Sequence, residues 1–167
     1  GLLAASYSLM QFGFAPLLGR WSDSYGRRPV LMLSLAGSVL AWLVFGLGTQ
    51  IGAVFGATAA ILTLFASRML GGAMGGNVAT AQAYVADVTS VDERTGALGL
   101  VGAAFGLGFI VGPALGAVLA SDPVVTGARR VLPAVIPATR FTLPSFGAAG
   151  ASLLALLAAW RFLPEPR

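Results

Sequence analysis

Stretches without any charged side chain dominate this sequence. They cover residues 1–19, 29–67, 69–86, 95–121 and 141–160. An ionised side chain at the centre of a bilayer is unfavourable by roughly 2.5 to 3.5 kcal/mol, and about 20 apolar residues cross the hydrocarbon. The stretches do not alternate as barrel strands do, so their backbone polar groups can be satisfied in lipid only as helices. We therefore expect an all-α, polytopic membrane helix bundle.

The charge-free stretches predict one partial domain over residues 1–167 with about five spans, at 1–19, 29–48, 52–86, 96–120 and 141–163. The interval 29–67 is too long for one crossing, and the segment Gly48-Thr49-Gln50-Ile51-Gly52 is expected to form a tight turn inside it. Residues 121–140 are expected to form a long irregular loop, because prolines and glycine recur there. The chain starts with Gly and without a basic leader, which indicates a fragment starting inside a span.

Arginines are distributed unequally between the two faces of the expected bundle. One face holds six, namely Arg20, Arg27, Arg28, Arg94, Arg161 and Arg167, and the other holds three, namely Arg129, Arg130 and Arg140. The positive-inside rule therefore predicts that the first face is cytoplasmic.

The composition excludes several classes of function. The chain has no Cys and no His, so it has no disulfide framework, no thiolate nucleophile and neither of the commonest zinc and haem ligands. We expect no metal, no cofactor and no enzymatic activity, because the loop carboxylates have no nucleophile beside them. Nucleic-acid binding is not expected either, since the Arg residues are scattered between apolar runs instead of forming one basic face.

The first connection is a short, charged loop bounded by glycines. It contains Gly19, Asp23, Gly26, Arg27 and Arg28, and its acid and Arg pair can bridge the end of one helix to the start of the next. Ordinary flanking charge is the alternative interpretation from spacing alone. The pattern G-x-x-x-D-x-x-G-R-R resembles the loop between the second and third helices of the major facilitator superfamily, and the resemblance implies a gating role for these five residues.

A lone charge interrupts the third predicted span. Arg68-Met69-Leu70-Gly71-Gly72 is similar to the fourth-helix motif R-x-x-Q-G of the proton antiporters in this superfamily, with Gly71 in place of glutamine. An Arg within a span is expected to face the protein interior or a wet cavity, where it is a functional candidate. Snorkelling toward the membrane surface is the alternative. The resemblance implies a role for Arg68 in coupling.

The fourth predicted span contains glycines at four-residue spacing beside a proline. Gly108, Gly112, Pro113 and Gly116 resemble the antiporter motif g-x-x-x-G-P-x-x-G-G, lacking only its last glycine. Small residues let helices approach closely, and proline removes a backbone hydrogen bond and can kink the helix. The resemblance implies an exporter that exchanges substrate for protons.

The connection between the third and fourth spans is acidic. Asp87 and Arg94 match best the cytoplasmic segment of tetracycline-resistance-type exporters, which this region resembles. The connection has the opposite net charge to the first loop and lies on the same face, so the two can pair.

The resemblance implies that the chain comprises helices two to six of an N-terminal six-helix half, without the first helix and the second half. Its implied partners are a small-molecule substrate, protons, the lipid bilayer and that missing half. Proton-coupled efflux by alternating access is the leading hypothesis; uptake of a sugar or another organic solute, and a non-transporting membrane fragment or scaffold, are the alternatives. The polar side chains that lie in apolar runs are Gln11, Asn77, Gln82 and Tyr84. They either line the substrate cavity or form hydrogen bonds to neighbouring helices.

Overall fold

A computed structural model describes residues 1–132 and 138–165. All of its regular elements are helices, which confirms the expected all-α class. They are α1 (Leu2–Tyr25), α2 (Arg27–Phe55), α3 (Ala57–Gly75), α4 (Val78–Val88), α5 (Val91–Leu119), α6 (Asp122–Val131) and α7 (Thr142–Phe162).

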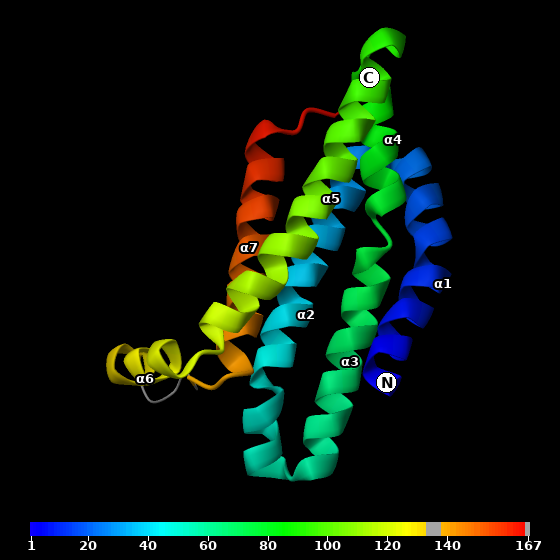
Figure 1. The fold of residues 1–167 in the computed structure, drawn as a ribbon. Coiled ribbons are helices and arrows are strands. Elements are labelled where there is room, and N and C mark those ends of the chain that lie inside the picture. Colours follow the sequence, from blue (N-terminus) through cyan, green and yellow to red (C-terminus); the bar gives the residue numbers. More distant parts are fainter. Residues whose placement is uncertain (133–137, 166–167) are drawn as a thin grey trace.

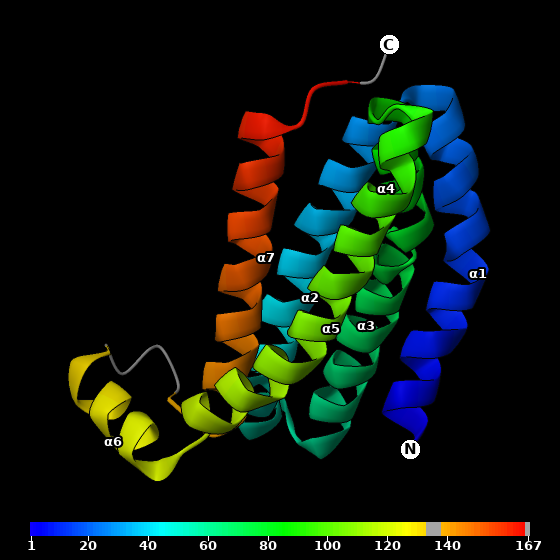
Figure 2. The same cartoon turned by 45° about the horizontal axis from the view of Figure 1, so that its top comes forward.

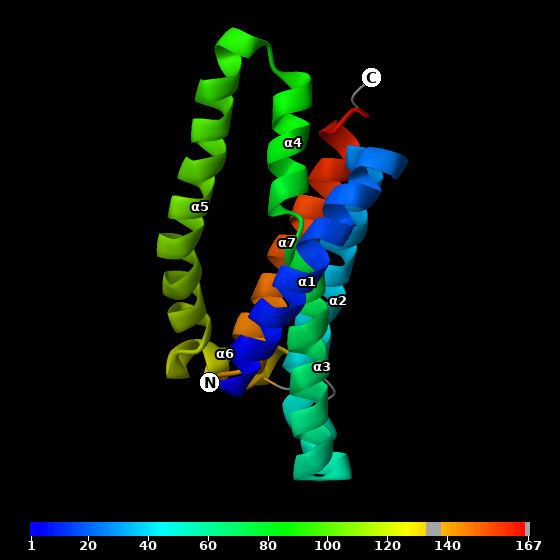
Figure 3. The same cartoon turned by 90° about the vertical axis from the view of Figure 1, so that its right-hand side faces the viewer.

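Helix α2 is the centre of the bundle. It packs against α3 on one side and α7 on the other, and α1 packs against α3 (Figures 1 and 2). Helix α5 stands apart from α1, α2 and α3 along most of its length, held by α4 at one end and by α6 and α7 at the other (Figure 3). No residue of α5 is buried, so its long apolar surface is open.

Within residues 1–132 and 138–165, five helical segments are long and apolar enough to cross a membrane. They are Leu2–Tyr25, Arg27–Phe55, Ala57–Val88, Val91–Leu119 and Thr142–Phe162, which confirms the expected number of spans. The helices α1 and α5 extend beyond the predicted limits at their charged ends, since charged residues that reach water do not end a helix.

The predicted turn at Gly48–Gly52 is wrong. Helix α2 continues through it to Phe55, and the chain reverses at Gly56, whose φ of 91° is readily adopted only by glycine. Both predicted turn glycines instead allow α2 to approach α3. A Cβ on Gly48 would lie 2.9 Å from Leu64, and one on Gly52 would lie 2.7 Å from Ala60.

The third span, predicted as one segment over residues 52–86, is broken into α3 and α4 at Gly76 and Asn77. The break lies where α3 crosses α1 at close range. A Cβ on Gly76 would lie 2.9 Å from the backbone of Ala15, so only glycine fits this crossing.

The prediction of an irregular loop over residues 121–140 is wrong for its first half, because residues 122–131 form α6. Pro123 lies in the first turn of the helix, where backbone N–H groups have no partner within the helix, so its missing N–H costs no hydrogen bond. The negative charge of Asp122 in the same turn interacts favourably with the helix dipole. The second half of that loop includes Pro133 and Pro137, which lie outside the described residues. So does Arg167, one of the six arginines used for the orientation.

Candidate functional site

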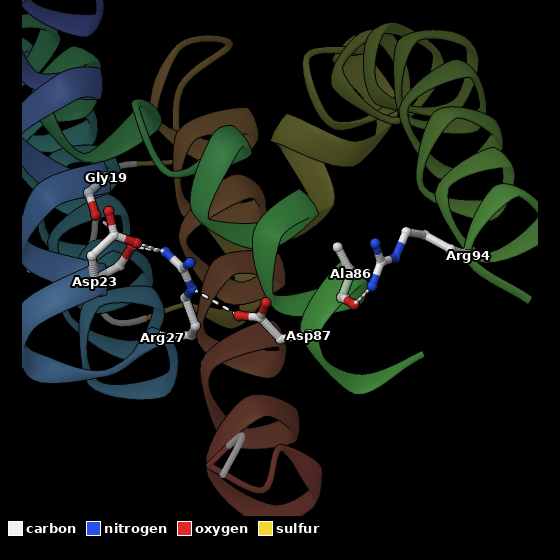
Figure 4. Close-up of polar contacts among 7 residues, drawn as sticks. Gly19, Asp23, Arg27, Ala86, Asp87 and Arg94 are labelled. Atoms are coloured by element: carbon white, nitrogen blue, oxygen red, sulfur yellow. Dashed lines mark hydrogen bonds and ion pairs between the residues drawn. The ribbon is translucent and has the colours of Figure 1, made fainter. Parts of the chain in front are cut away.

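Arg27 joins three helices at one end of the bundle. Its guanidinium lies 2.5 Å from Asp23 at the end of α1 and 3.0 Å from Asp87 near the end of α4 (Figure 4). Its Nη1 also donates a hydrogen bond of 2.7 Å to the buried hydroxyl of Ser22. We call Asp23, Arg27 and Asp87 the Arg27 cluster.

The local backbone explains why these side chains meet. Helix α1 ends at Tyr25 and α2 begins at Arg27, so one residue makes the whole reversal. That residue, Gly26, has a φ of 99°, a conformation that disfavours any side chain. The short reversal brings Asp23 and Arg27 together although they belong to different helices, which confirms the expected partner of Asp23.

Arg28 and Arg94, two other arginines expected on this face, form their hydrogen bonds elsewhere. Arg28 donates a hydrogen bond of 2.8 Å from Nη2 to the carbonyl of Trp160, and so ties the start of α2 to the end of α7. Arg94 donates one of 2.8 Å to the carbonyl of Ala86 (Figure 4). Gly19 contributes only its carbonyl, which accepts a hydrogen bond from Ser22.

An open polar pocket of about 520 Å³ surrounds the Arg27 cluster. Arg94 and Glu165 line it as well, and Glu165 lies directly against the backbone of Gly26. The sequence pattern did not single out Glu165, because it follows the last helix and belongs to none of the motifs.

The ion pairs of the Arg27 cluster are partly in water. The side chain of Arg27 is 21% exposed, but those of Asp23 and Asp87 are 64% and 42% exposed. Pairs exposed to this degree contribute only about 0 to 1 kcal/mol each. The cluster therefore holds the three helix ends together with bonds that are easily exchanged for water.

Arg68 lies near the middle of α3, among aromatic rings. Its Cζ is 4.4 Å from the ring centroid of Trp42 and 4.2 Å from that of Phe45, both on α2. A cavity of about 80 Å³ beside it is lined by Tyr7, Ser38, Ala41, Trp42, Gly71 and Gly75. Arg68 thus points into the protein, and no ion pair joins it to an acid of the described residues.

Trp42 and Phe45 were not predicted as part of this site. They are ordinary apolar residues of a membrane span, and only their three-residue spacing, which puts two rings on one helix face, could have identified them. Stacking of a cation on ring faces is attractive by about 2 kcal/mol or more where water is excluded. The two rings therefore partly replace the water that the guanidinium loses.

The candidate cavity residues mainly connect helices. Gln11 donates a hydrogen bond of 3.0 Å to the carbonyl of Gly75, which is next to the helix break, and Asn77 donates one of 2.6 Å to Ser34. Tyr84 donates one of 3.0 Å to the carbonyl of Pro164. Gln82 is exposed. For Gln11 and Asn77 this geometry favours interhelical bonding over cavity lining.

The glycine and proline motif of α5 meets no neighbouring helix. A Cβ on Gly108, Gly112 or Gly116 would have no heavy atom within 4 Å. An open apolar pocket of about 460 Å³ lies on the same helix, lined by Val101, Ala104, Phe105, Gly108 and Phe109. The packing role of the motif with Pro113 remains a prediction.

The sequence of the chain is similar to the sequences of several known proteins. The family profile described as Major Facilitator Superfamily matches residues 1–167. The class D tetracycline resistance protein of Salmonella ordonez is 42% identical over 146 residues, 87% of this chain and 34% of that protein. The major facilitator superfamily domain-containing protein 10 of Bos taurus is 42% identical over 124 residues, 74% of this chain and 25% of that protein.

A solved structure is similar in fold as well as in sequence. It is the crystal structure of the human organic anion transporter MFSD10 (TETRAN), with a TM-score of 0.70 and 34% identity. The match covers 99% of this chain and 32% of that one. The chain thus spans about a third or less of the length of these relatives.

Proposed function

The chain belongs to the major facilitator superfamily and is part of a multi-pass membrane protein, and we propose that the full-length protein exports small organic compounds in exchange for protons. Proteins of this superfamily are transporters and in general not enzymes. In this proposal the chain supplies helices two to six of the N-terminal half, and the substrate path lies between this half and a second one.

The observation that carries the proposal is the position of the Arg27 cluster. It joins the ends of α1, α2 and α4 through partly exposed ion pairs of 2.5 and 3.0 Å. A transporter that alternates between two open states needs contacts at one face that hold and then release. Exposed pairs meet both needs, because each is weak and water replaces it readily.

The relatives support the choice of substrate class. Several are named tetracycline resistance proteins, and the similar solved structure is titled an organic anion transporter. Arg68 supports an anionic or partly anionic compound, since its charge lies against two rings with no acid of the described residues paired to it.

The proton carrier is expected in the rest of the protein. A guanidinium stays protonated at all relevant pH values, so Arg68 can bind an anion or attract a proton-carrying acid but cannot release a proton itself. The acids of this chain lie outside the middle of the spans, at Asp23, Asp87, Asp92, Glu93, Asp122 and Glu165.

Transport in proteoliposomes tests the proposal. The full-length protein is reconstituted, the lumen is made acidic, and accumulation of tetracycline and of a fluorescent aromatic carboxylate is measured. We expect accumulation of at least one compound against its gradient, with loss of accumulation when a protonophore removes the pH difference.

Three results would overturn the proposal. Equilibration that is independent of the pH difference would indicate a uniporter. Entry coupled to protons moving in the same direction as the solute would indicate uptake. The absence of flux for any compound, from protein shown to be folded by its thermal unfolding, would support the non-transporting scaffold.

A further inference from the structure

Helix α6 runs crosswise to the other helices and projects outward from the bundle (Figures 1 and 2). The other helices of the described residues run along the bundle, with α3 and α4 together forming one crossing, whereas α6 projects sideways from the end of α5 (Figures 1 and 2). It begins at Asp122, three residues after α5 ends at Leu119, and α7 begins at Thr142. Because α5 and α7 both cross the membrane, α6 is tethered at the membrane boundary, on the face opposite the Arg27 cluster.

The sequence of α6 separates into two faces. Val124, Ala128 and Val131 recur at a spacing of four and three residues, which places them on one side of the helix. The other side is polar, with Asp122, Thr126, Arg129 and Arg130. A helix with such separated faces is typical of a segment that lies in the interface between water and lipid.

The described residues cover the apolar side only in part, since Val124 and Ala128 are partly exposed and Val131 is exposed. Val131 is 83% exposed, although Val125, on the flank of the apolar side, is only 5% exposed. An exposed valine on a helix fixed at the membrane boundary can be removed from water by the acyl chains beside it. Burial of one such side chain is favourable by about 1.5 kcal/mol or more.

Polar contacts fix the orientation of α6. Asp122 lies 2.5 Å from Arg140, just before α7, and Arg129 donates a hydrogen bond of 2.9 Å from Nε to the carbonyl of Ala138. These contacts bind the start and the end of α6 to the segment that leads into α7. They leave its polar side with excess positive charge, since Arg129, Arg130 and Arg140 outnumber the one carboxylate of Asp122.

We propose that α6 is an interfacial helix that binds the membrane surface, with Val124, Ala128 and Val131 among the lipid chains and Arg129 and Arg130 at the phosphates of anionic phospholipids. The excess positive charge selects anionic over zwitterionic headgroups, by about 1 kcal/mol for each Arg near such a surface. The proposal requires only that α5 and α7 span the membrane, so it stands apart from the proposed transport.

Site-specific labels test the position of the helix. This chain has no Cys, so single cysteines can be placed at Val131 and Val124 on the apolar side and at Thr126 on the polar side of the full-length protein, with any other cysteines replaced. Each is labelled with an environment-sensitive dye in vesicles of phosphatidylcholine and phosphatidylglycerol. We expect blue-shifted emission quenched by nitroxide-labelled lipid for V131C and V124C, and emission quenched by aqueous iodide for T126C.

Two outcomes of that measurement would overturn the proposal. Iodide quenching at all three positions would mean that α6 lies in water. Protection of V131C from both quenchers would mean that a protein segment, not lipid, covers the apolar side.

A second arm tests the headgroup contact. The emission of V131C is compared between vesicles with and without phosphatidylglycerol, in the parent, in R129Q/R130Q and in the matched control R20Q, which removes an exposed Arg from the opposite face. We expect a further blue shift with phosphatidylglycerol in the parent and in R20Q, and loss of this added shift in R129Q/R130Q. Equal shifts in all three proteins would refute the role of the two Arg residues.

Discussion

Arg27 Nε donates a hydrogen bond of 3.0 Å to Asp87 Oδ2 and so connects the start of α2 to α4, across 60 residues of sequence. The same guanidinium pairs with Asp23 of α1, so one side chain bonds two acids from two helices. Removing Arg27 would therefore leave both acids without this partner, whereas removing one acid leaves the other pair intact. The first two predictions follow from this arrangement.

Replacing Asp23 by Asn is expected to abolish most transport by the full-length protein and leave membrane insertion intact. The carboxylate is 64% exposed, so the free energy of unfolding should fall by no more than about 1 kcal/mol. Initial transport rates in proteoliposomes and thermal unfolding in detergent measure the two effects. D92N, in an exposed acid outside the Arg27 cluster, is the control, and normal transport by D23N would refute the gating role.

Exchanging the charges of Arg27 and Asp87 is expected to restore part of the function that either single change removes. R27D should lose more transport than D87R, because R27D places three acids together whereas D87R keeps the pair with Asp23. A double-mutant cycle on the unfolding free energies should give a coupling of about 0.2 to 1 kcal/mol. A coupling of zero, with no gain of transport in the double variant, would show that the contact is incidental.

Replacing Arg68 by Ala is expected to remove proton-driven transport, and replacing it by Lys to remove most of it. Lys keeps the charge but loses the flat guanidinium that lies over the rings of Trp42 and Phe45. Measurement of both variants with and without an imposed pH difference separates coupling from binding. If both variants express normally and keep full coupling, Arg68 is a flanking charge without a role in transport.

The rings around Arg68 can be tested separately. W42L should lower the free energy of unfolding by about 0.5 to 2 kcal/mol, because the guanidinium of Arg68 loses its contact with one of two rings. The same loss should weaken the binding of an anionic substrate. L43I, at an exposed neighbour on the same helix, is the control for expression and insertion. Substrate dependence of the transport rate gives the binding effect, and an unchanged KM for W42L would exclude the ring from the site.

Gly72 is expected to tolerate no side chain. A Cβ there would collide with the backbone carbonyl of Tyr7, so G72A should destabilise the protein by about 1 to 3 kcal/mol through separation of α1 and α3. Gly96, in the first turns of α5, has open space in the same position, and G96A should be neutral or stabilising by up to about 1 kcal/mol. Equal unfolding temperatures for the two variants would contradict the close crossing.

The sequence predicted the features that depend on composition along the chain. The five spans follow from charge-free length, and the acid and Arg pair of the first charged loop indicated the bridge that Asp23 forms with Arg27. The one-residue reversal at Gly26 was not predicted, because residues 20–28 were expected to form the loop. The position of the α2–α3 turn did not follow, because Gly48 and Gly52 look like turn residues but serve helix packing, and only the backbone shows that Gly56 has a positive φ.

One contact between distant segments was predicted, because the opposite charges of two connections on the same face indicated that they can pair, as Arg27 and Asp87 do. The contacts of Arg68 were not predicted. The three-residue spacing of Trp42 and Phe45 puts two rings on one face of α2, but it does not show that this face meets Arg68, because that depends on how α2 and α3 pack against each other. Helix α6 was missed because its proline and glycine suggested a loop, although Pro123 lies in the first turn, where helices accept it.

The break at Gly76 and Asn77 makes α3 and α4 two separate helical rods, and these two residues are the joint between them. Arg68 belongs to one rod and Asp87 to the other, so a rotation at Arg68 is not transmitted rigidly to the Arg27 cluster. The hydrogen bonds from Gln11 to the carbonyl of Gly75 and from Asn77 to Ser34 are made at this joint. A tilt of the 11-residue α4 can thus separate Asp87 from Arg27 while the rings around Arg68 remain packed.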